Sequence, residues 1–381
     1  MTEIFLTIFF ISVLLFFLGT GVWVALSMIG VSSIGMMLFT SRPVGDAMAT
    51  TIWGSSSSWT LTALPLFVWM GEILFRTKLS ENLFKGLSPW MQRLPGGLIH
   101  VNVIGCALFA AISGSSAATV ATVGKMSIPE LRKRNYPEKI LLGSLAGSGT
   151  LGLLIPPSII LIIYGVTVQE SIAKLFIAGI LPGIMIALIF MSYVIVWSLI
   201  NKKNMPISTE NFSFLEKIKK SKQLLPVILL ILGVIGSIYT GIATATEAAS
   251  LGVVGALILS YFQKSLSIET FKSSLLGATK TSCMIAFILA GATFLSLAMG
   301  FTGLPRNLAI WIQNMELSPH VLIFVLMIFY IILGMFLDGI SAVVLTMAII
   351  EPMIRQAGFD MIWFGIFVFW KLPVRELPSG I

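Results

Sequence analysis

The sequence predicts an all-α polytopic membrane protein, built from two inverted repeats that contain re-entrant hairpins and broken helices. Three observations predict this fold class: the composition, the distribution of lysine and arginine, and a repeat at an offset of about 225 residues.

The composition excludes an ordinary soluble domain. Of the 381 residues, 57% are hydrophobic and 10% are charged, and the mean hydropathy is +0.99. A soluble domain carries about 25% charged residues. Runs such as Ile4–Leu18, Val22–Leu38 and Ile177–Ile200 approach or exceed the roughly 20 residues of a membrane-spanning helix. Because lipid offers no partners for backbone groups, we expect helices, in about ten to twelve membrane segments of which some are too short to cross.

Cysteine and net charge argue against other classes. Cys106 and Cys283 both lie in apolar runs and predict neither a disulfide framework nor a metal site. The formal net charge of +8 fits basic residues gathered in cytoplasmic loops better than it fits a nucleic-acid-binding protein.

Lysine and arginine predict the orientation. Eighteen of the 24 basic residues lie in four segments assigned to the inside: 76–97, 125–139, 201–223 and 263–280. Four lie in segments assigned to the outside: Arg42, Lys174, Arg306 and Arg355. This bias predicts a multi-pass inner-membrane protein whose N-terminus lies outside. The tally requires that segments near 98–124 and 319–350 enter and return on the same side.

An internal repeat appears when Ile73–Leu83 (ILFRTKLSENL) is aligned with Ala298–Leu308 (AMGFTGLPRNL). The first copy's basic loop is assigned inside and the second copy's loop outside, so the repeats are inverted. Inverted repeats with interrupted helices are typical of secondary transporters, whose sites lie near the bilayer midplane.

The repeats predict the domain organisation. The first repeat takes residues 1–200, with scaffold helices at about 1–60 and a hairpin and broken helix at about 98–165. A cytoplasmic basic linker follows at 201–223, and the second repeat takes 224–381.

The first polar interruption is Leu108–Val123, which reads LFAAISGSSAATVATV. Gly114, Ser115 and Ser116 stand between two apolar arms. The segment from about Ile99 to Ile128 therefore predicts two half-length helices that meet at a Gly-Ser tip.

The second interruption is Leu142–Ile163, which reads LGSLAGSGTLGLLIPPSIILII. Pro156 and Pro157 remove two backbone donors and predict a break in the helix. A broken helix at membrane depth is tolerated where it lines a cavity, and its carbonyls can coordinate sodium. The breaks also supply hydroxyl groups: Ser116, Ser148, Thr150 and Ser158. An alternative is that the small residues only let helices pack closely.

The second repeat offers Asp338 at the equivalent of the first tip. An ionisable residue between apolar runs is costly unless paired or hydrated, so it is a candidate functional residue. Its alternative role is to cap a half-helix. Glu247 is expected to cap the following helix, and Glu72 to lie near the inner interface.

Several stretches in order resemble the large membrane subunit of the tripartite ATP-independent periplasmic (TRAP) transporters, over the chain up to about residue 369. The matching stretches are LPLFVWMGEIL (64–74), SGSSAATVATVGKMSIPELRKRNYP (113–137), AGSGTLGLLIPPSIILIIYG (146–165), AGILPG (178–183), TATEAA (244–249) and GMFLDGISAVVLT (334–346).

The resemblance implies an elevator-type transporter that imports a small organic acid (a C4-dicarboxylate, sialic acid or similar carboxylate) with sodium as coupling ion and no other cofactor. It implies three partners: a small four-helix membrane subunit, a periplasmic substrate-binding protein and the lipid bilayer. The first sodium site would use Ser115, Ser116, Gly149 and Thr150, beside Gly114, Pro156 and Pro157. The second would use Asp338 and Gly339; no residue is expected to be catalytic.

The end of the chain departs from the family pattern. The counterpart of Gly149–Ile159 would lie at about 371–381, where the chain reads KLPVRELPSGI instead of a second proline break. We therefore expect an incomplete second half-site in a C-terminally truncated chain. The alternatives are a sodium-coupled symporter of a related elevator family that works without a binding protein, and a non-functional truncated gene product. An intramembrane enzyme is not expected, because His100 and His320 have no metal-site spacing.

Overall fold

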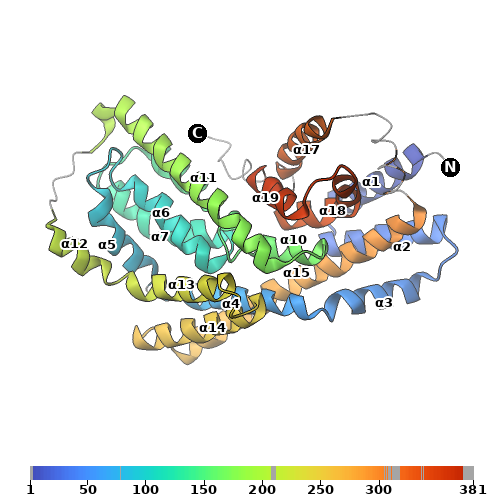
Figure 1. Ribbon diagram of the computed structural model, residues 1–381, viewed down its shortest axis with the longest axis horizontal. Coiled ribbons are helices and arrows are strands. Elements are labelled where there is room, and N and C mark those ends of the chain that lie inside the picture. Colours follow the sequence, from blue (N-terminus) through green and yellow to red (C-terminus); the bar gives the residue numbers. More distant parts are fainter. Residues whose placement is uncertain are drawn as a thin grey trace. The chain divides into compact units, whose positions relative to one another are not determined.

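The structure is a computed structural model that describes residues 3–77, 79–206, 212–303, 305, 307, 310, 318–335, 337 and 339–371. Within these ranges the chain forms helices and no strand (Figure 1). The all-α prediction is therefore confirmed.

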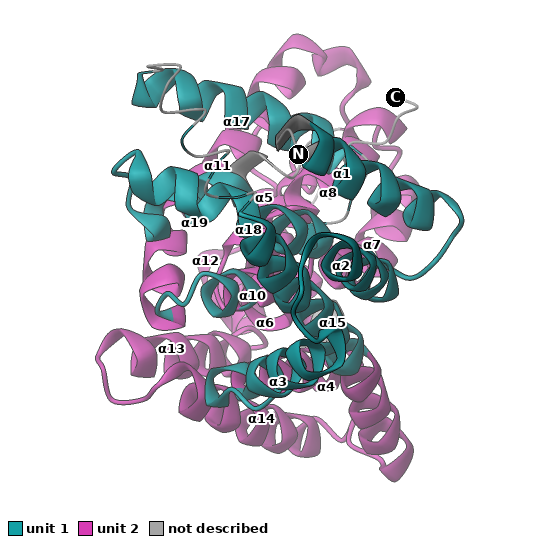
Figure 2. Cartoon of the chain, turned by 90° about the vertical axis from the view of Figure 1, so that its right-hand side faces the viewer, with its two compact units in different colours: residues 1–62, 163–171, 281–372 teal, residues 63–162, 172–280, 373–381 magenta. Residues whose placement is uncertain are grey.

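The helices group into two compact units, each assembled from segments that are distant in the sequence (Figure 2). Unit 1 comprises residues 1–62, 163–171 and 281–372, and unit 2 comprises 63–162, 172–280 and 373–381. Contacts define these units, whereas sequence correspondence defines the repeats, so the repeat boundaries stay a prediction.

Unit 1 contains α1 (Glu3–Gly19), α2 (Val24–Phe39), α3 (Val44–Ser56), η1 (Trp59–Thr62), α17 (Pro319–Gly334), α18 (Gly339–Gln356) and α19 (Met361–Lys371). Unit 2 contains α4 (Ala63–Phe75), α5 (Leu79–Met91), α6 (Ile99–Ser113), α7 (Ser116–Lys133), α8 (Glu138–Gly149), α9 (Leu151–Leu154), α11 (Ile172–Ile200), η2 (Lys202–Asn204), α12 (Phe214–Ser221), α13 (Leu225–Tyr239) and α14 (Ala245–Phe262). Two helices continue from one unit into the other: α10 (Ile159–Thr167) and α15 (Ile268–Thr302).

Five helical segments of the described chain are long and apolar enough to cross a membrane, or seven if each of two bent pairs counts as one span. Four further apolar helices are shorter: Ile8–Gly19, Val24–Phe39, Ile99–Ser113 and Pro319–Gly334. The predicted mixture of full spans and shorter apolar segments is therefore present.

Helix α6 lies at the centre of unit 2. Twelve of its 15 residues are buried, and it contacts α4, α5, α7, α8, α9 and α11. A helix that is apolar on all sides is expected to be enclosed by others rather than to face solvent on one side. The predicted hairpin is thus confirmed as α6 and α7, and its second arm extends five residues beyond Ile128, to Lys133.

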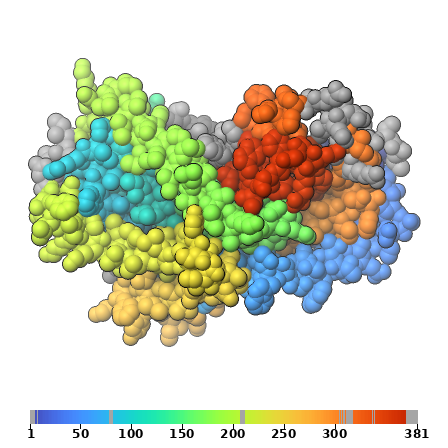
Figure 3. All heavy atoms as spheres, viewed as in Figure 1, coloured from blue at the N-terminus to red at the C-terminus, as the bar shows by residue number. Residues whose placement is uncertain are grey.

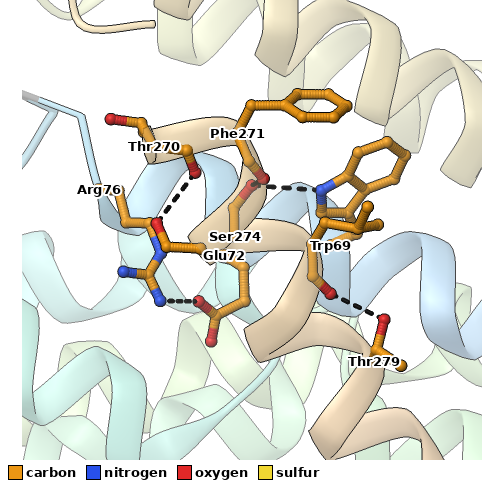
Figure 4. A network of polar contacts seen from close by, with 9 residues as sticks. Trp69, Glu72, Arg76, Thr270, Phe271, Ser274 and Thr279 are labelled. Atoms are coloured by element: carbon orange, nitrogen blue, oxygen red, sulfur yellow. Dashed lines mark hydrogen bonds and ion pairs between the residues drawn. The ribbon is translucent and has the colours of Figure 1, made fainter. Parts of the chain in front are cut away.

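Polar contacts join α4 to the first part of α15 (Figure 4). The indole Nε1 of Trp69 donates to Ser274 Oγ at 3.3 Å. One turn further along α4, Glu72 forms an ion pair with Arg76 at 3.0 Å. A Cβ at position 277 would lie 2.7 Å from Glu72 Oε2, so Gly277 leaves room for this carboxylate against α15.

Two further helices of unit 2, α14 and α12, begin at capping boxes. Helix α14 begins with a capping box, in which Glu247 Oε2 accepts from the Thr244 amide and hydroxyl, both at 2.8 Å. The predicted capping role of Glu247 is therefore confirmed. Part of the predicted linker is also helical, because α12 begins at a second capping box formed by Ser213 and Glu216.

In unit 1, α17 and α18 form a second helical hairpin beside α19. The hydroxyls of Tyr330 and Thr346 lie 2.8 Å apart and join the two arms near their tip. The hydroxyl of Tyr164, on the last part of α10, donates to the Met361 carbonyl at the start of α19 at 2.6 Å. A Cβ at Gly365 would lie 2.6 Å from the Tyr164 ring, so the glycine lets α19 pack directly against that ring.

We expect Tyr164→Phe to lower the free energy of unfolding by about 1 kcal/mol, because the Met361 carbonyl loses its buried donor while the ring packing stays. Thermal unfolding in detergent measures the change. The control is Tyr193→Phe, which removes a hydroxyl from a residue that is 59% exposed. Equal stability of the two variants would contradict the role of the Tyr164 hydroxyl.

Candidate functional site

The tip of the first hairpin is formed by Gly114 and Ser115. Gly114 ends α6 in the left-handed conformation, with φ +58°, which glycine adopts without strain. A Cβ there would lie 2.5 Å from the Pro157 carbonyl oxygen, so glycine is also needed for space. Ser115 starts α7, and its Oγ accepts from the Ala118 amide at 3.5 Å. The tip is therefore a helix end and a helix start joined by two residues.

A small hydroxyl network holds this turn. The hydroxyls of Ser113 and Thr119 lie 3.0 Å apart, and Thr119 Oγ1 donates to the Ser115 carbonyl at 2.8 Å. Ser113 and Thr119 are buried, whereas Ser115 and Ser116 are half-buried. The network fixes the backbone of the tip and leaves its two serines nearer the surface.

The predicted broken helix is confirmed as α8, α9 and α10. Together they form one apolar segment of 30 residues, Glu138–Thr167. Helix α9 ends at Leu154, and the buried Pro156 and Pro157 follow, joined by a cis peptide bond. Ser158 Oγ donates to the Leu153 carbonyl at 2.7 Å and so supplies one donor that the prolines lack.

The hairpin tip and the broken helix meet. The Ile159 amide, at the start of α10, donates to the Gly114 carbonyl at 3.1 Å. A Cβ at Gly152 would lie 2.9 Å from the Ser116 amide nitrogen, so the backbone of α9 lies directly against the tip. A Cβ at Gly149 would overlap Val120 Cγ2. Glycine at these two positions, three residues apart on one face, allows the contact.

Four helix ends consequently gather at this point: the carboxyl ends of α6 and α9 and the amino ends of α7 and α10. Carbonyl oxygens at a carboxyl end favour a cation, and amide groups at an amino end favour an anion. The half-buried hydroxyls of Ser115 and Ser116 add oxygen atoms. This arrangement has the chemistry to hold a small cation and a carboxylate close together.

The structure brings together five of the predicted site residues: Gly114, Ser115, Ser116, Gly149 and Pro157. Thr150 is adjacent, but its Oγ1 donates back to the Gly147 carbonyl at 2.6 Å within α8. Pro156 lies in the same turn. Of the second half-site, Gly339 begins α18, and Asp338 lies outside the described residues, as does the polar stretch 372–381.

Two polar features escaped the sequence reasoning. In unit 1, Arg355 donates to the Val168 carbonyl at 3.0 Å and pairs with Glu351 at 2.9 Å and Glu170 at 3.5 Å. The contact ties the far end of α18 to the loop after α10. The i,i+4 spacing of Glu351 and Arg355 was a usable signal for part of it.

The other missed feature lies in unit 2, where Asn102 Nδ2 donates to Ser144 Oγ at 3.0 Å and to the Leu141 carbonyl at 3.3 Å. These bonds join α6 to α8. A fully buried amide in an apolar segment signals an interhelical hydrogen bond, and Asn102 is 0% exposed.

Comparisons with known proteins match the chain to one transporter family. The family model described as "Tripartite ATP-independent periplasmic transporter, DctM component" matches residues 10–377. The chain is 31% identical over 356 residues to a C4-dicarboxylate TRAP transporter large permease protein of Pseudomonas aeruginosa, covering 93% of this chain and 83% of that protein.

Two further relatives carry other substrate names. The chain is 32% identical over 327 residues to a 2,3-diketo-L-gulonate TRAP transporter large permease protein of Escherichia coli, covering 84% of this chain and 75% of that protein. It is 30% identical over 369 residues to a sialic acid TRAP transporter large permease protein of Vibrio cholerae, covering 96% and 85%.

We expect Gly152→Val to lower the free energy of unfolding by about 1–3 kcal/mol, because the new side chain would meet backbone atoms of the tip that cannot move cheaply. Hydrogen exchange at residues 114–119 should also increase, since the tip would be displaced from the broken helix. Thermal unfolding and exchange mass spectrometry measure the two effects.

The matched control for this experiment is Gly143→Val, also on the broken helix, where no atom lies within 4 Å of the added Cβ. If both variants unfold at the same temperature and exchange at the tip is unchanged, the close contact between α9 and the tip is wrong.

Proposed function

We propose a function from the premise that this chain belongs to the DctM family of tripartite ATP-independent periplasmic (TRAP) transporters, whose family model matches 10–377. It is a large permease subunit, an all-α membrane protein that transports a solute and is not an enzyme.

We propose that the meeting point of the hairpin tip and the broken helix is a sodium site. The observation that supports this most directly is the hydrogen bond between the Ile159 amide and the Gly114 carbonyl, because it joins two helix breaks in one place. Ser115, Ser116 and Thr150 supply hydroxyl oxygens, and the ends of α6 and α9 supply carbonyls. Sodium favours such uncharged oxygen ligands over nitrogen or sulfur. For Thr150 to act as a ligand, a lone pair of its Oγ1 must bind the ion while its hydroxyl still donates to the Gly147 carbonyl.

We propose that the same site also binds an anionic solute. The amino ends of α7 and α10 carry partial positive charge and favour a carboxylate beside the tip. A cation bound at the neighbouring carboxyl ends would strengthen that attraction. Binding of the ion and of the solute would then favour each other, which is what coupled transport requires.

The second half-site is proposed at Asp338 and Gly339, which follow α17 in the sequence; Gly339 is the first residue of α18. The helix order supports it: α6, α7 and then α8 follow the same hairpin-then-helix sequence as α17, α18 and α19. We propose that these are the inverted repeats and that the hairpins and broken helices move together across the membrane in an elevator motion. The N-terminus would lie in the periplasm, as the basic residues predict.

The proposed solute is a small organic acid. The three relatives described above are named for a C4-dicarboxylate, 2,3-diketo-L-gulonate and sialic acid, all of which carry carboxylates. The proposed partners are a small four-helix membrane subunit and a periplasmic binding protein, since the family is tripartite. A related symporter that works alone is the competing proposal.

We expect proteoliposomes that hold the full chain and its small subunit to accumulate an organic acid only with an inward sodium gradient and the binding protein encoded beside the gene. The probes are radiolabelled succinate and sialic acid. Uptake that persists when choline replaces sodium would eliminate sodium coupling. Uptake without binding protein would favour the competing symporter, and absence of uptake of either probe under all conditions would contradict the proposed solute class.

Ser116→Ala should raise the sodium concentration for half-maximal uptake about tenfold, the effect of losing roughly 1.4 kcal/mol from one oxygen ligand. Asp338→Asn should raise it at least as much if the second half-site binds sodium. Ser192→Ala is the control, because its hydroxyl donates only to the Leu188 carbonyl one turn earlier on α11. A sodium dependence equal to that of the control would exclude the altered residue from the ion site.

A further inference from the structure

Helix α12 is a short amphipathic helix that departs from the direction of the apolar helix after it. It bends by 58° from α13, across a break of a few residues. Its start is fixed by the capping box, in which the Ser213 amide donates to Glu216 Oε2 at 2.9 Å. An amphipathic helix at an angle to a membrane helix is typical of a segment that lies in the lipid interface.

The apolar side chains of α12 are exposed and lie close together. Phe214 is 66% exposed, Leu215 79% and Ile218 43%. At about 100° per residue they form one stripe roughly 100° wide. Large apolar side chains that gather on one face of a helix mark a surface with an apolar partner.

Lysines accompany this stripe. Lys219, Lys220 and Lys222 are exposed, and among the described residues none of them forms an ion pair. The acidic residue of the helix, Glu216, is already engaged by the cap. Lys219 lies beside the stripe, whereas Lys220 lies on the far side of the helix, with its Nζ 3.9 Å from the centre of the Phe212 ring. The exposed surface of α12 therefore combines an apolar stripe with an excess of positive charge.

One side of α12 is attached to α5, and Phe214 belongs partly to this contact, because its ring packs edge-on against the Trp90 ring with 6.2 Å between the centroids. Leu215 and Ile218 are the stripe residues that stay outside this contact. Trp90 Nε1 donates to Ser221 Oγ at 2.7 Å, and Lys217 Nζ lies 5.5 Å from the centre of the Trp90 ring. Lys217 is 9% exposed, so this lysine belongs to the packing between the helices and not to the free surface. In the space-filling view α12 lies at the surface of unit 2 beside α5 (Figure 3).

We propose that α12 and Trp90 form a binding surface for anionic phospholipids of the surrounding bilayer. Phe214, Leu215 and Ile218 enter the boundary between headgroups and acyl chains, and the three exposed lysines contact the phosphate groups. Trp90 is 39% exposed, with the amphipathic ring that favours the depth of the headgroups. A soluble protein partner would not require a bent interfacial helix, and its polar interface would leave the stripe without an apolar environment.

The test measures quenching of Trp90 fluorescence by brominated lipids. The full chain is reconstituted in nanodiscs of phosphatidylcholine to which brominated phosphatidylglycerol or brominated phosphatidylcholine is added. Subtracting the signal of the Trp90→Phe variant isolates Trp90 from the other eight tryptophans. We expect stronger quenching by the brominated phosphatidylglycerol.

The triple variant K219Q/K220Q/K222Q should reduce the preference for phosphatidylglycerol at least about tenfold, since each lysine near a membrane contributes several-fold to anionic-lipid binding. The control is K133Q/K139Q/K264Q, which removes the same charge from three exposed lysines elsewhere and should leave the preference unchanged. A double variant, L215S/I218S, should weaken quenching by both lipids, because it removes the apolar insertion.

Two results would overturn the proposal. Equal quenching by the two lipids in the unaltered chain would exclude recognition of the anionic headgroup. Absence of quenching of Trp90 by either lipid would mean that water or a protein covers this surface. Hydrogen exchange at residues 214–221 of each variant distinguishes loss of binding from loss of the helix.

Discussion

Backbone amides and carbonyls inside an apolar structure need hydrogen-bond partners, and the bond from the Ile159 amide to the Gly114 carbonyl meets that need at two helix breaks at once. A helix that ends at Gly114 leaves carbonyls without intrahelical partners, and a helix that restarts at Ile159 leaves amides. When the two breaks lie side by side, an amide of one can donate to a carbonyl of the other. The location of the hairpin tip within unit 2 follows from this pairing.

The contact between the hairpin tip and the broken helix also requires that their backbones approach closely. This approach depends on small residues at specific positions. Gly149 and Gly152 present a surface without side chains to α7, and Gly114 leaves space for the Pro157 carbonyl. The glycines that allow helices to touch also bring carbonyls, amides and the hydroxyls of Ser115 and Ser116 into one small volume, which is the proposed site for an ion and a carboxylate.

Helix α10 begins in unit 2 and ends in unit 1. Its first residue bonds to the tip of the first hairpin, and Tyr164, near its other end, bonds to α19. Just after the helix, Val168 and Glu170 contact Arg355 at the end of α18. The first residue of this nine-residue helix therefore has its polar contact within unit 2, and Tyr164 has its polar contact within unit 1.

The sequence by itself determined the helical class, the tip at Gly114–Ser116 and the break at Pro156–Pro157, because apolar run length, glycine and proline act locally on the backbone. It also determined the cap at Glu247, which depends on a spacing of three residues. Only the tertiary structure decided that the tip and the break adjoin, that Asn102 joins α6 to α8, and that Arg355 contacts Glu170. These contacts join residues far apart in the chain, and no local pattern specifies which distant partner satisfies a buried polar group.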